Sequence, residues 1–105
     1  MRQLKLNKSG IIIPVMSLGT WAFGGDAIWG KTDEMQAIDT ARRAVEMGIV
    51  QIDTAPAYGM GKSEEILGEA LKGIRDKVIL STKCGLSWDE GNICLLYTSD
   101  AADDL

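Results

Sequence analysis

The residues best suited to chemistry are an acid, a phenol and an amine that follow strand-like runs. Asp53 comes at the end of an apolar run, and Tyr58 stands five positions later, beyond Pro56, whose ring stiffens the connection. Lys83 ends the next strand-like run, residues 77–83. At the same ends of neighbouring parallel strands, these three side chains would form a proton-transfer site.

A scaffold of alternating strands and helices is predicted around them. Residues 3–6 and 11–13 flank the turn residues 7–10, a pattern that predicts a hairpin. Further strands are predicted at residues 15–20, 49–53 and 77–83. A helix is expected between Thr32, its predicted N-cap, and Gly48, and a second one is expected to be capped by Ser63.

Both helices carry apolar stripes at helical spacing, which predict their buried faces. The first stripe is Met35, Ile38, Ala41 and Val45, and the second is Ile66, Leu67, Ala70, Leu71 and Ile74.

Strands that alternate with helices of this length imply right-handed crossovers and a parallel sheet. Two α/β architectures remain open: a doubly wound sheet, or a piece of a (β/α)8 TIM barrel. In both, function lies at the carboxyl ends of the strands, where Gly19, Thr20, Asp53 and Lys83 all fall.

Two glycine-rich segments do not fit nucleotide-binding motifs. Residues 59–63 resemble the end of a phosphate-binding loop, but Pro56 occupies the position of the first glycine and has no N–H to offer. We read that segment as a turn before a capped helix. Gly24 and Gly25 do not form the dinucleotide-binding pattern after the first strand.

Composition excludes several classes of protein. The chain has 105 residues, 46% apolar and 25% charged, with a net charge of −4, no histidine and two cysteines. These values predict one domain, no metal site and no nucleic-acid partner. No membrane-spanning run or signal peptide is visible, so a cytoplasmic location is expected. Cys84 is expected to be a buried small residue.

Three motifs resemble the aldo-keto reductase family. They are Asp53-Thr54-Ala55-x-x-Tyr58-Gly59, Ser63-Glu64-x-x-Leu67-Gly68 and Ser81-Thr82-Lys83, and the resemblance runs from about residue 2 to about residue 92. It implies a (β/α)8 barrel whose bottom is closed by the N-terminal hairpin. Only the hairpin and the first three βα units would be present, because such a barrel needs roughly 250 residues.

The resemblance also implies a cofactor and a mechanism. The cofactor would be NADP(H), with NAD(H) as the alternative, and the substrate a small carbonyl compound or alcohol. Tyr58 would be the general acid, Lys83 would favour its phenolate form, and Asp53 would hold Lys83. Gly19, Thr20 and Trp21 would line the cofactor's nicotinamide end, and Asp53 would also contact the cofactor. A family histidine completes this set, and the sequence has none.

Other functions remain open from the sequence. A non-catalytic relative could bind nucleotide as a regulatory subunit, and a barrel aldolase could use Lys83 as a Schiff-base nucleophile. Asp53 and Lys83 could also be a structural ion pair. The sequence predicts neither the substrate nor the oligomeric state.

The last residues break the pattern. Residues 94–103 resemble the in-frame translation of a transposase adapter used in DNA sequencing libraries, which suggests a family domain at residues 1–93 and a non-native tail at 94–105. The tail holds three of the 15 acidic residues, so 12 would remain against 11 basic ones and the net charge would be −1. We expect the 105-residue chain by itself to be inactive.

Overall fold

A computed structural model describes residues 2–25, 30–89 and 92–95, with side chains described for residues 2–25 and 30–85. The strands are β1 (Gln3–Lys5), β2 (Ile12–Pro14), β3 (Leu18–Gly19), β4 (Gln51–Asp53), β5 (Ile79–Ser81), β6 (Leu86–Asp89) and β7 (Asn92–Leu95). The helices are α1 (Glu34–Glu46) and α2 (Lys62–Ala70), with short 3-10 helices η1 (Asn7–Ser9), η2 (Trp21–Gly24) and η3 (Arg75–Lys77).

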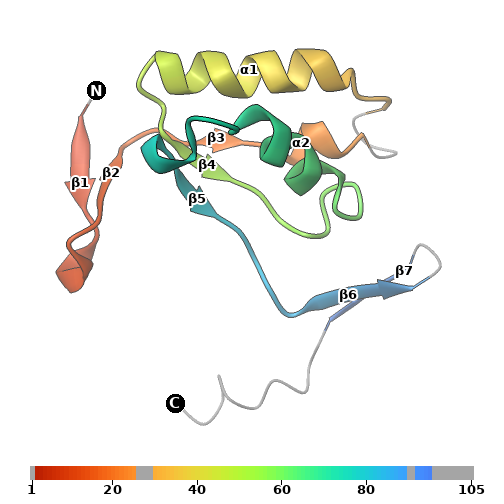
Figure 1. Ribbon diagram of the computed structural model, residues 1–105. Helices are drawn as coiled ribbons and strands as arrows, with labels where there is room; N and C mark the ends of the chain where they lie inside the picture. Colours follow the sequence, from red (N-terminus) through yellow and green to blue (C-terminus); the bar gives the residue numbers. More distant parts are fainter. Residues whose placement is uncertain (1, 26–29, 90–91, 96–105) are drawn as a thin grey trace, which may run out of the picture.

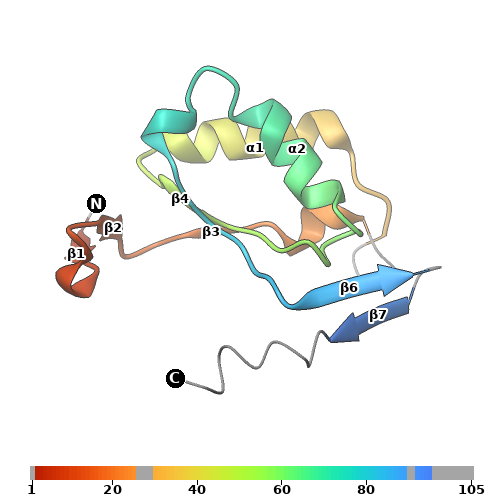
Figure 2. The same cartoon turned by 60° about the horizontal axis from the view of Figure 1, so that its bottom comes forward.

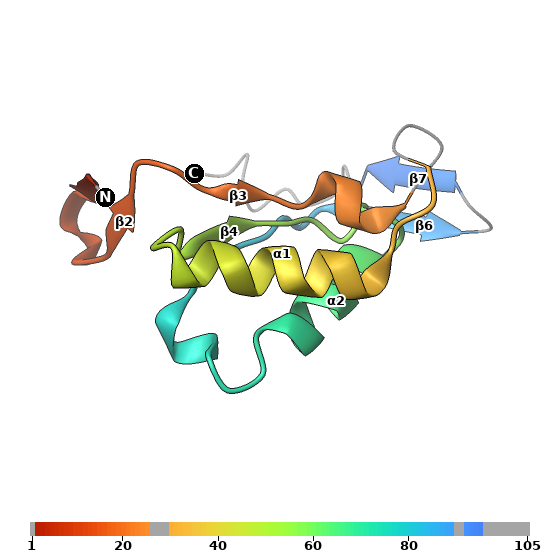
Figure 3. The ribbon, with the colours of Figure 1, turned by 90° about the horizontal axis from the view of Figure 1, so that it is seen from above.

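The central sheet is parallel, as predicted, with strand order β3-β4-β5. Its register places Gly19 beside Asp53 and Asp53 beside Ser81, so the strand ends align. Both α1 and α2 lie on the same side of this sheet (Figures 1 and 3). Helices on one side only are typical of a barrel segment, whereas a doubly wound sheet carries helices on both faces.

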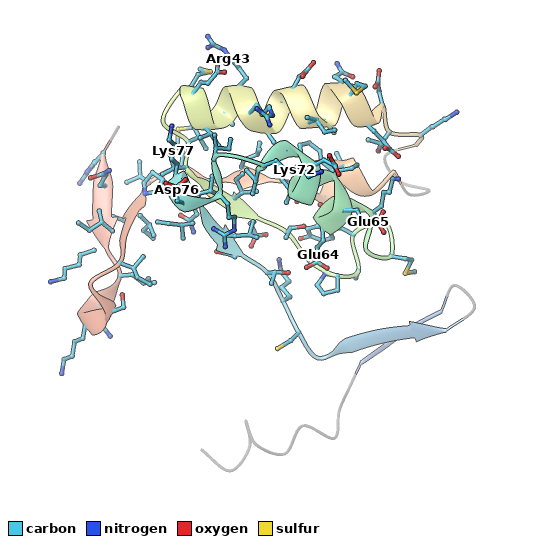
Figure 4. The ribbon with its side chains drawn as sticks, in the orientation of Figure 1. Arg43, Glu64, Glu65, Lys72, Asp76 and Lys77 are labelled. Atoms are coloured by element: carbon cyan, nitrogen blue, oxygen red, sulfur yellow. The ribbon has the colours of Figure 1, made fainter. Side chains whose placement is uncertain are left out.

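The core lies between the sheet and the two helices. The α2 stripe is confirmed, because Ile66, Leu67, Ala70 and Leu71 are buried and Ile74 packs against the core. The α1 stripe is correct only in part. Met35 is 67% exposed, and the buried face of α1 consists of Ala37, Ala41 and Ala44. Small side chains allow α1 to approach its neighbours closely, while Arg43 projects from its outer surface (Figure 4).

The predicted helix starts are both wrong. Asp33, not Thr32, is the N-cap of α1, because its side chain accepts a hydrogen bond from Gln36 N at 3.2 Å. The N-cap of α2 is Gly61, at φ 94°, and Ser63 lies inside the helix with its side chain buried. Gly48, at φ 91°, follows the end of α1 as expected.

The N-terminal hairpin forms as predicted, and it stands apart from the helices and the central sheet (Figure 1). Its turn is η1, and Gly10 takes the left-handed conformation at φ 78°. Large apolar side chains on the hairpin are between 43% and 54% exposed: Leu4, Leu6, Ile11 and Ile12.

A second antiparallel hairpin, β6–β7, follows the central unit (Figure 2). Cys84, just before it, is exposed, which corrects the expectation that it is buried. β5 ends at Ser81, three residues before Cys84, so strand pairing does not bury this thiol. The predicted boundary at residue 93 falls inside β7, and residues 96–105 of the predicted tail lie outside the described residues.

Candidate active site

The structure brings Asp53, Tyr58 and Lys83 together at the carboxyl ends of β4 and β5. Lys83 Nζ lies 3.0 Å from Asp53 Oδ2, 2.9 Å from Thr54 O and 3.4 Å from Tyr58 Oη. The side chains of Lys83 and Asp53 are 46% and 41% exposed, so a ligand can reach them. The ammonium also lies 5.1 Å from the centre of the Tyr58 ring.

The three contacts of Lys83 have a chemical consequence. An ammonium has three hydrogens, and each of these three oxygens takes one. Tyr58 Oη is therefore an acceptor toward Lys83, and its own proton must point to a different acceptor. The hydrogen bond to Asp53 is the largest cause that raises the pKa of Lys83, against the opposing effect of burial, and the bond to Tyr58 adds to it. The ammonium therefore stays charged at neutral pH.

Backbone hydrogen bonds hold the loop that carries Tyr58. Tyr58 N donates to Ala55 O at 3.1 Å, and Ser63 N donates to Tyr58 O at 3.1 Å. Gly61 N closes the turn on Pro56 O at 2.8 Å. The ring of Trp21 stacks on that of Tyr58, with centroids 6.2 Å apart and planes 24° apart. Backbone hydrogen bonds of Tyr58 and the stacked ring of Trp21 thus hold the phenol in place.

Behind the strand ends, three buried hydroxyls form a chain. Thr20 Oγ1 donates to Asp53 O at 2.9 Å, so it must accept from Ser63 Oγ, 2.8 Å away. Ser63 then has no second proton, and Thr54 Oγ1, 2.9 Å from it, must be the donor of that pair. The chain joins β3, β4 and α2. It fixes the backbone of Asp53 and Thr54, both of which contact Lys83.

The predicted cofactor residues differ in what they present. Gly19 is open, since a Cβ there would meet nothing within 4 Å, and Trp21 is 44% exposed. Thr20 is completely buried, and its hydroxyl is used by the hydroxyl chain. The surface is therefore open at Gly19 and part of the Trp21 side chain is accessible, whereas Thr20 supports the strand ends from within.

The structure also argues against a phosphate-binding loop at residues 59–63. Lys62 pairs with Glu34 on α1, and the hydrogen bond to Glu34 raises the pKa of Lys62 above its ordinary value. Ser63 is buried and faces Thr20. The two side chains that would contact a phosphate and its metal ion are therefore both engaged elsewhere.

Two further features lie outside the strand-end cluster, as we call Asp53, Tyr58 and Lys83. A cavity of about 490 Å³ is lined mainly by α2 and the turn that follows it, with Leu67, Leu71 and Leu80 among its walls, but not by Asp53, Tyr58 or Lys83. Glu64, near the start of α2 (Figure 4), accepts a hydrogen bond from Thr82 Oγ1 at 3.2 Å. Glu64 thus ties α2 to the segment that leads to Lys83.

Within the described residues, no three metal-binding side chains gather, and no helix has the length and apolarity to cross a bilayer. Sequence reasoning found Asp53, Tyr58 and Lys83 but missed the supporting roles of Thr54 and Ser63. The signal was present, since both lie inside the quoted motifs, yet a serine near a helix start reads first as a cap.

Known proteins resemble this chain over most of its length. The family model of the aldo/keto reductase family matches residues 15–101, a range that extends past residue 93. The aldo-keto reductase YhdN of Bacillus subtilis is 50% identical over 95 residues, which cover 89% of this chain and 28% of the relative. The NADH-specific methylglyoxal reductase of Escherichia coli is 45% identical over 91 residues, 85% of this chain and 28% of the relative.

Solved structures of aldo-keto reductases also resemble this chain. The aldo-keto reductase AKR11C1 of Bacillus halodurans matches 99% of this chain and 35% of its own, with a TM-score of 0.78 and 29% identity. An aldo/keto reductase of Klebsiella pneumoniae in complex with NADP and acetate matches 71% of this chain and 25% of its own, with a TM-score of 0.63 and 35% identity. The chain spans about 28% of the length of the curated relatives above. With its parallel strand ends and its matched motifs, the chain belongs to the aldo/keto reductase family.

Proposed function

We propose that the complete protein carrying this segment is an oxidoreductase that interconverts carbonyl compounds and alcohols with NADP(H). The observation that carries the proposal is Lys83 Nζ within hydrogen-bond distance of both Asp53 Oδ2 and Tyr58 Oη. A positive charge in contact with a phenol stabilises the phenolate that remains once the phenol has given its proton to the substrate.

Each residue of the site has a separate role in the proposed reaction. The reduced nicotinamide supplies the hydride for the carbonyl carbon when it is bound. As the π electrons of the carbonyl move onto oxygen, Tyr58 gives that oxygen its phenolic proton and becomes a phenolate, which solvent later reprotonates. Lys83 stabilises the phenolate, and Asp53 holds Lys83 in place. Gly19 and Trp21 would face the nicotinamide, which fits the open space over Gly19.

Small aldehydes and ketones are the substrate class that we propose. One relative is named a methylglyoxal reductase, so methylglyoxal is the first compound to test. NADP(H) is the proposed cofactor because a structural relative was solved with NADP. The same methylglyoxal reductase is named NADH-specific, which makes NAD(H) the alternative. Steady-state rates with the two reduced forms decide between them.

The raised pKa and the three hydrogen bonds of Lys83 argue against the Schiff-base alternative. Such a nucleophile needs a neutral amine, which burial or a neighbouring cation produces by lowering the lysine pKa. Here Asp53 and Tyr58 raise the pKa of Lys83, and its three N–H groups already have acceptors. A non-catalytic relative would keep cofactor binding without turnover, so turnover separates it from the enzyme.

The test replaces the proposed acid in the complete protein. Tyr58→Phe removes one hydroxyl, and we expect kcat with methylglyoxal to fall by about 10²–10⁴-fold while the cofactor Kd changes little. Lys83→Met should also reduce kcat strongly. Lys72→Met is the matched control, because the exposed Lys72, just after α2, forms an ion pair only with Glu69 within the described residues. A Tyr58→Phe enzyme that retains more than about a tenth of kcat would contradict the proposal.

A further inference from the structure

Two glycine backbones touch where η2 meets the loop of Tyr58. A Cβ at Gly24 would lie 2.5 Å from Gly59 N and 2.6 Å from Tyr58 C. A Cβ at Gly59 would lie 2.2 Å from Gly24 O. Real Cβ atoms do not approach backbone this closely, so neither position accepts a side chain unless one of the two segments moves.

Of the two segments, η2 is firmly anchored. Thr20, just before it, donates to Asp53 O from both its backbone N, at 3.2 Å, and its Oγ1, at 2.9 Å. Phe23 of η2 is 8% exposed and belongs to the core cluster. Thr32 Oγ1 donates to Ala22 O at 2.9 Å, which ties η2 to the segment before α1. Because η2 has these anchors, an atom added at Gly24 would push against the Tyr58–Gly59 backbone and shift the loop against its own hydrogen bonds.

We propose that Gly24 is a positioning residue: its contact with Gly59 sets the place of the Tyr58 backbone and thus the distance from the phenol to Lys83. This inference rests on the proposed function of Tyr58. The loop touches η2 through the backbone of Tyr58 and Gly59, and Tyr58 Oη lies 3.4 Å from Lys83 Nζ. That separation is already at the long end for a hydrogen bond, so a small displacement of the loop is enough to misplace the phenol relative to Lys83.

Gly24 offers a cleaner test than Gly59. Gly59 has φ 65°, so a side chain there would strain the backbone wherever the loop stood. Gly24 is absent from the described residues with positive φ, and alanine at this position suffers only from the close contact. Gly68 on α2 is the matched control, because its φ is ordinary and a Cβ there would meet nothing within 4 Å.

The experiment measures kcat and KM of Gly24→Ala, Gly68→Ala and Tyr58→Phe in the complete protein, well below their unfolding midpoints. For Gly24→Ala we expect kcat to fall about 10–100-fold with little change in KM for the carbonyl, because misplacing a catalytic group by about 1 Å can cost that much. Gly68→Ala should keep the parent kcat. Val78→Ala, in the core and away from Tyr58, controls for lost stability.

The outcomes separate the two proposals. If Tyr58→Phe abolishes turnover but Gly24→Ala keeps the parent kcat, the positioning role is wrong and the proposed acid stands. If Tyr58→Phe stays active, the proposed function fails whatever Gly24→Ala does, and the positioning role fails with it. A Val78→Ala enzyme whose kcat falls as far as that of Gly24→Ala would assign the loss to stability and overturn the positioning role.

A second variant decides the matter if Gly24→Ala does not fold. Thr32→Val removes the hydrogen bond to Ala22 O and so loosens η2 from the segment before α1. This bond is at the surface, and its loss should leave the fold intact. We expect a severalfold fall in kcat at constant KM, and an unchanged kcat would overturn the positioning role.

Discussion

The strand ends of the central sheet and the N-terminal hairpin differ in which side chains they bury and which they expose. At the strand ends, Thr20, Thr54 and Ser63 are at most 1% exposed, and each hydroxyl has its partner. On the hairpin, Leu4 and Ile12 are 53% and 54% exposed. One region buries polar groups that are fully paired, while the other leaves apolar groups in water.

The difference shows which side chains find all their contacts within this chain and which do not. A buried hydroxyl is costly unless it is hydrogen-bonded, and the strand-end hydroxyls meet that requirement with residues of this segment alone. Exposed leucine and isoleucine side chains gain nothing until another surface covers them. The family resemblance implies that the hairpin closes the bottom of a barrel, and the strands that would complete this barrel are not among those described.

The largest expected effect comes from expressing residues 1–105 alone. We expect this chain to aggregate or to remain molten and to bind no NADPH, because the edge of β5 and the apolar hairpin side chains stay uncovered. Dye binding to exposed apolar surface and NADPH fluorescence are the measurements. A soluble monomer with saturable NADPH fluorescence enhancement would contradict the prediction, and the complete protein serves as the positive control.

A pair of serine substitutions compares the two regions directly. Ser63→Ala leaves Thr54 without its acceptor and Thr20 without its donor, and should lower the free energy of unfolding of the complete protein by about 1–3 kcal/mol. Ser9→Ala removes exposed hydrogen bonds in the hairpin turn and should cost less than about 0.5 kcal/mol. Urea unfolding measures both, and equal losses would show that burial does not set the difference.

A pair of isoleucine substitutions asks whether the hairpin is covered in the complete protein. Ile52→Val removes a methylene from a fully buried side chain and should cost about 0.5–1.5 kcal/mol. If the hairpin closes a barrel, Ile12→Val should cost an amount in the lower part of the same range. The measurement is again urea unfolding of the complete protein. A loss at Ile12 that cannot be distinguished from zero would show that the hairpin stays exposed there too.

The smallest expected effect is the pH dependence of the Lys83–Asp53 pair. Because the folded state raises the pKa of Lys83, chiefly through the hydrogen bond to Asp53, the pair stabilises the fold fully below the ordinary lysine value of about 10.4. That contribution is lost as the pH rises through the raised pKa. Both side chains are substantially exposed, so the loss should stay below about 1 kcal/mol.

The measurement for this pair is the unfolding midpoint between pH 9 and pH 12, with Lys83→Met as the control. The parent protein should lose slightly more stability than Lys83→Met over this range. Identical pH dependence in the two proteins would remove Lys83 as the cause.

The sequence predicted the alternation of strands and helices and the three residues of the strand-end cluster, but it misplaced details that depend on local geometry. Ser63 reads as a helix cap because serine suits that position, yet left-handed Gly61 begins the helix and turns the serine inward. Cys84 is expected to be buried because free cysteine is among the most buried residue types, yet strand pairing ends at Ser81 and Cys84 is exposed. Met35 fits the apolar period of α1 but lies on the exposed side.

The sequence by itself determined that an acid, a phenol and an amine stand at strand ends, because residue type and chain order set those positions. Only the tertiary structure decided the rest. The direction of the hydroxyl chain follows from which buried oxygens meet, and Gly24 and Gly59, far apart in the sequence, touch through backbone atoms that no side-chain pattern records. Contacts of this kind depend on how two loops approach in space, to within a fraction of an ångström.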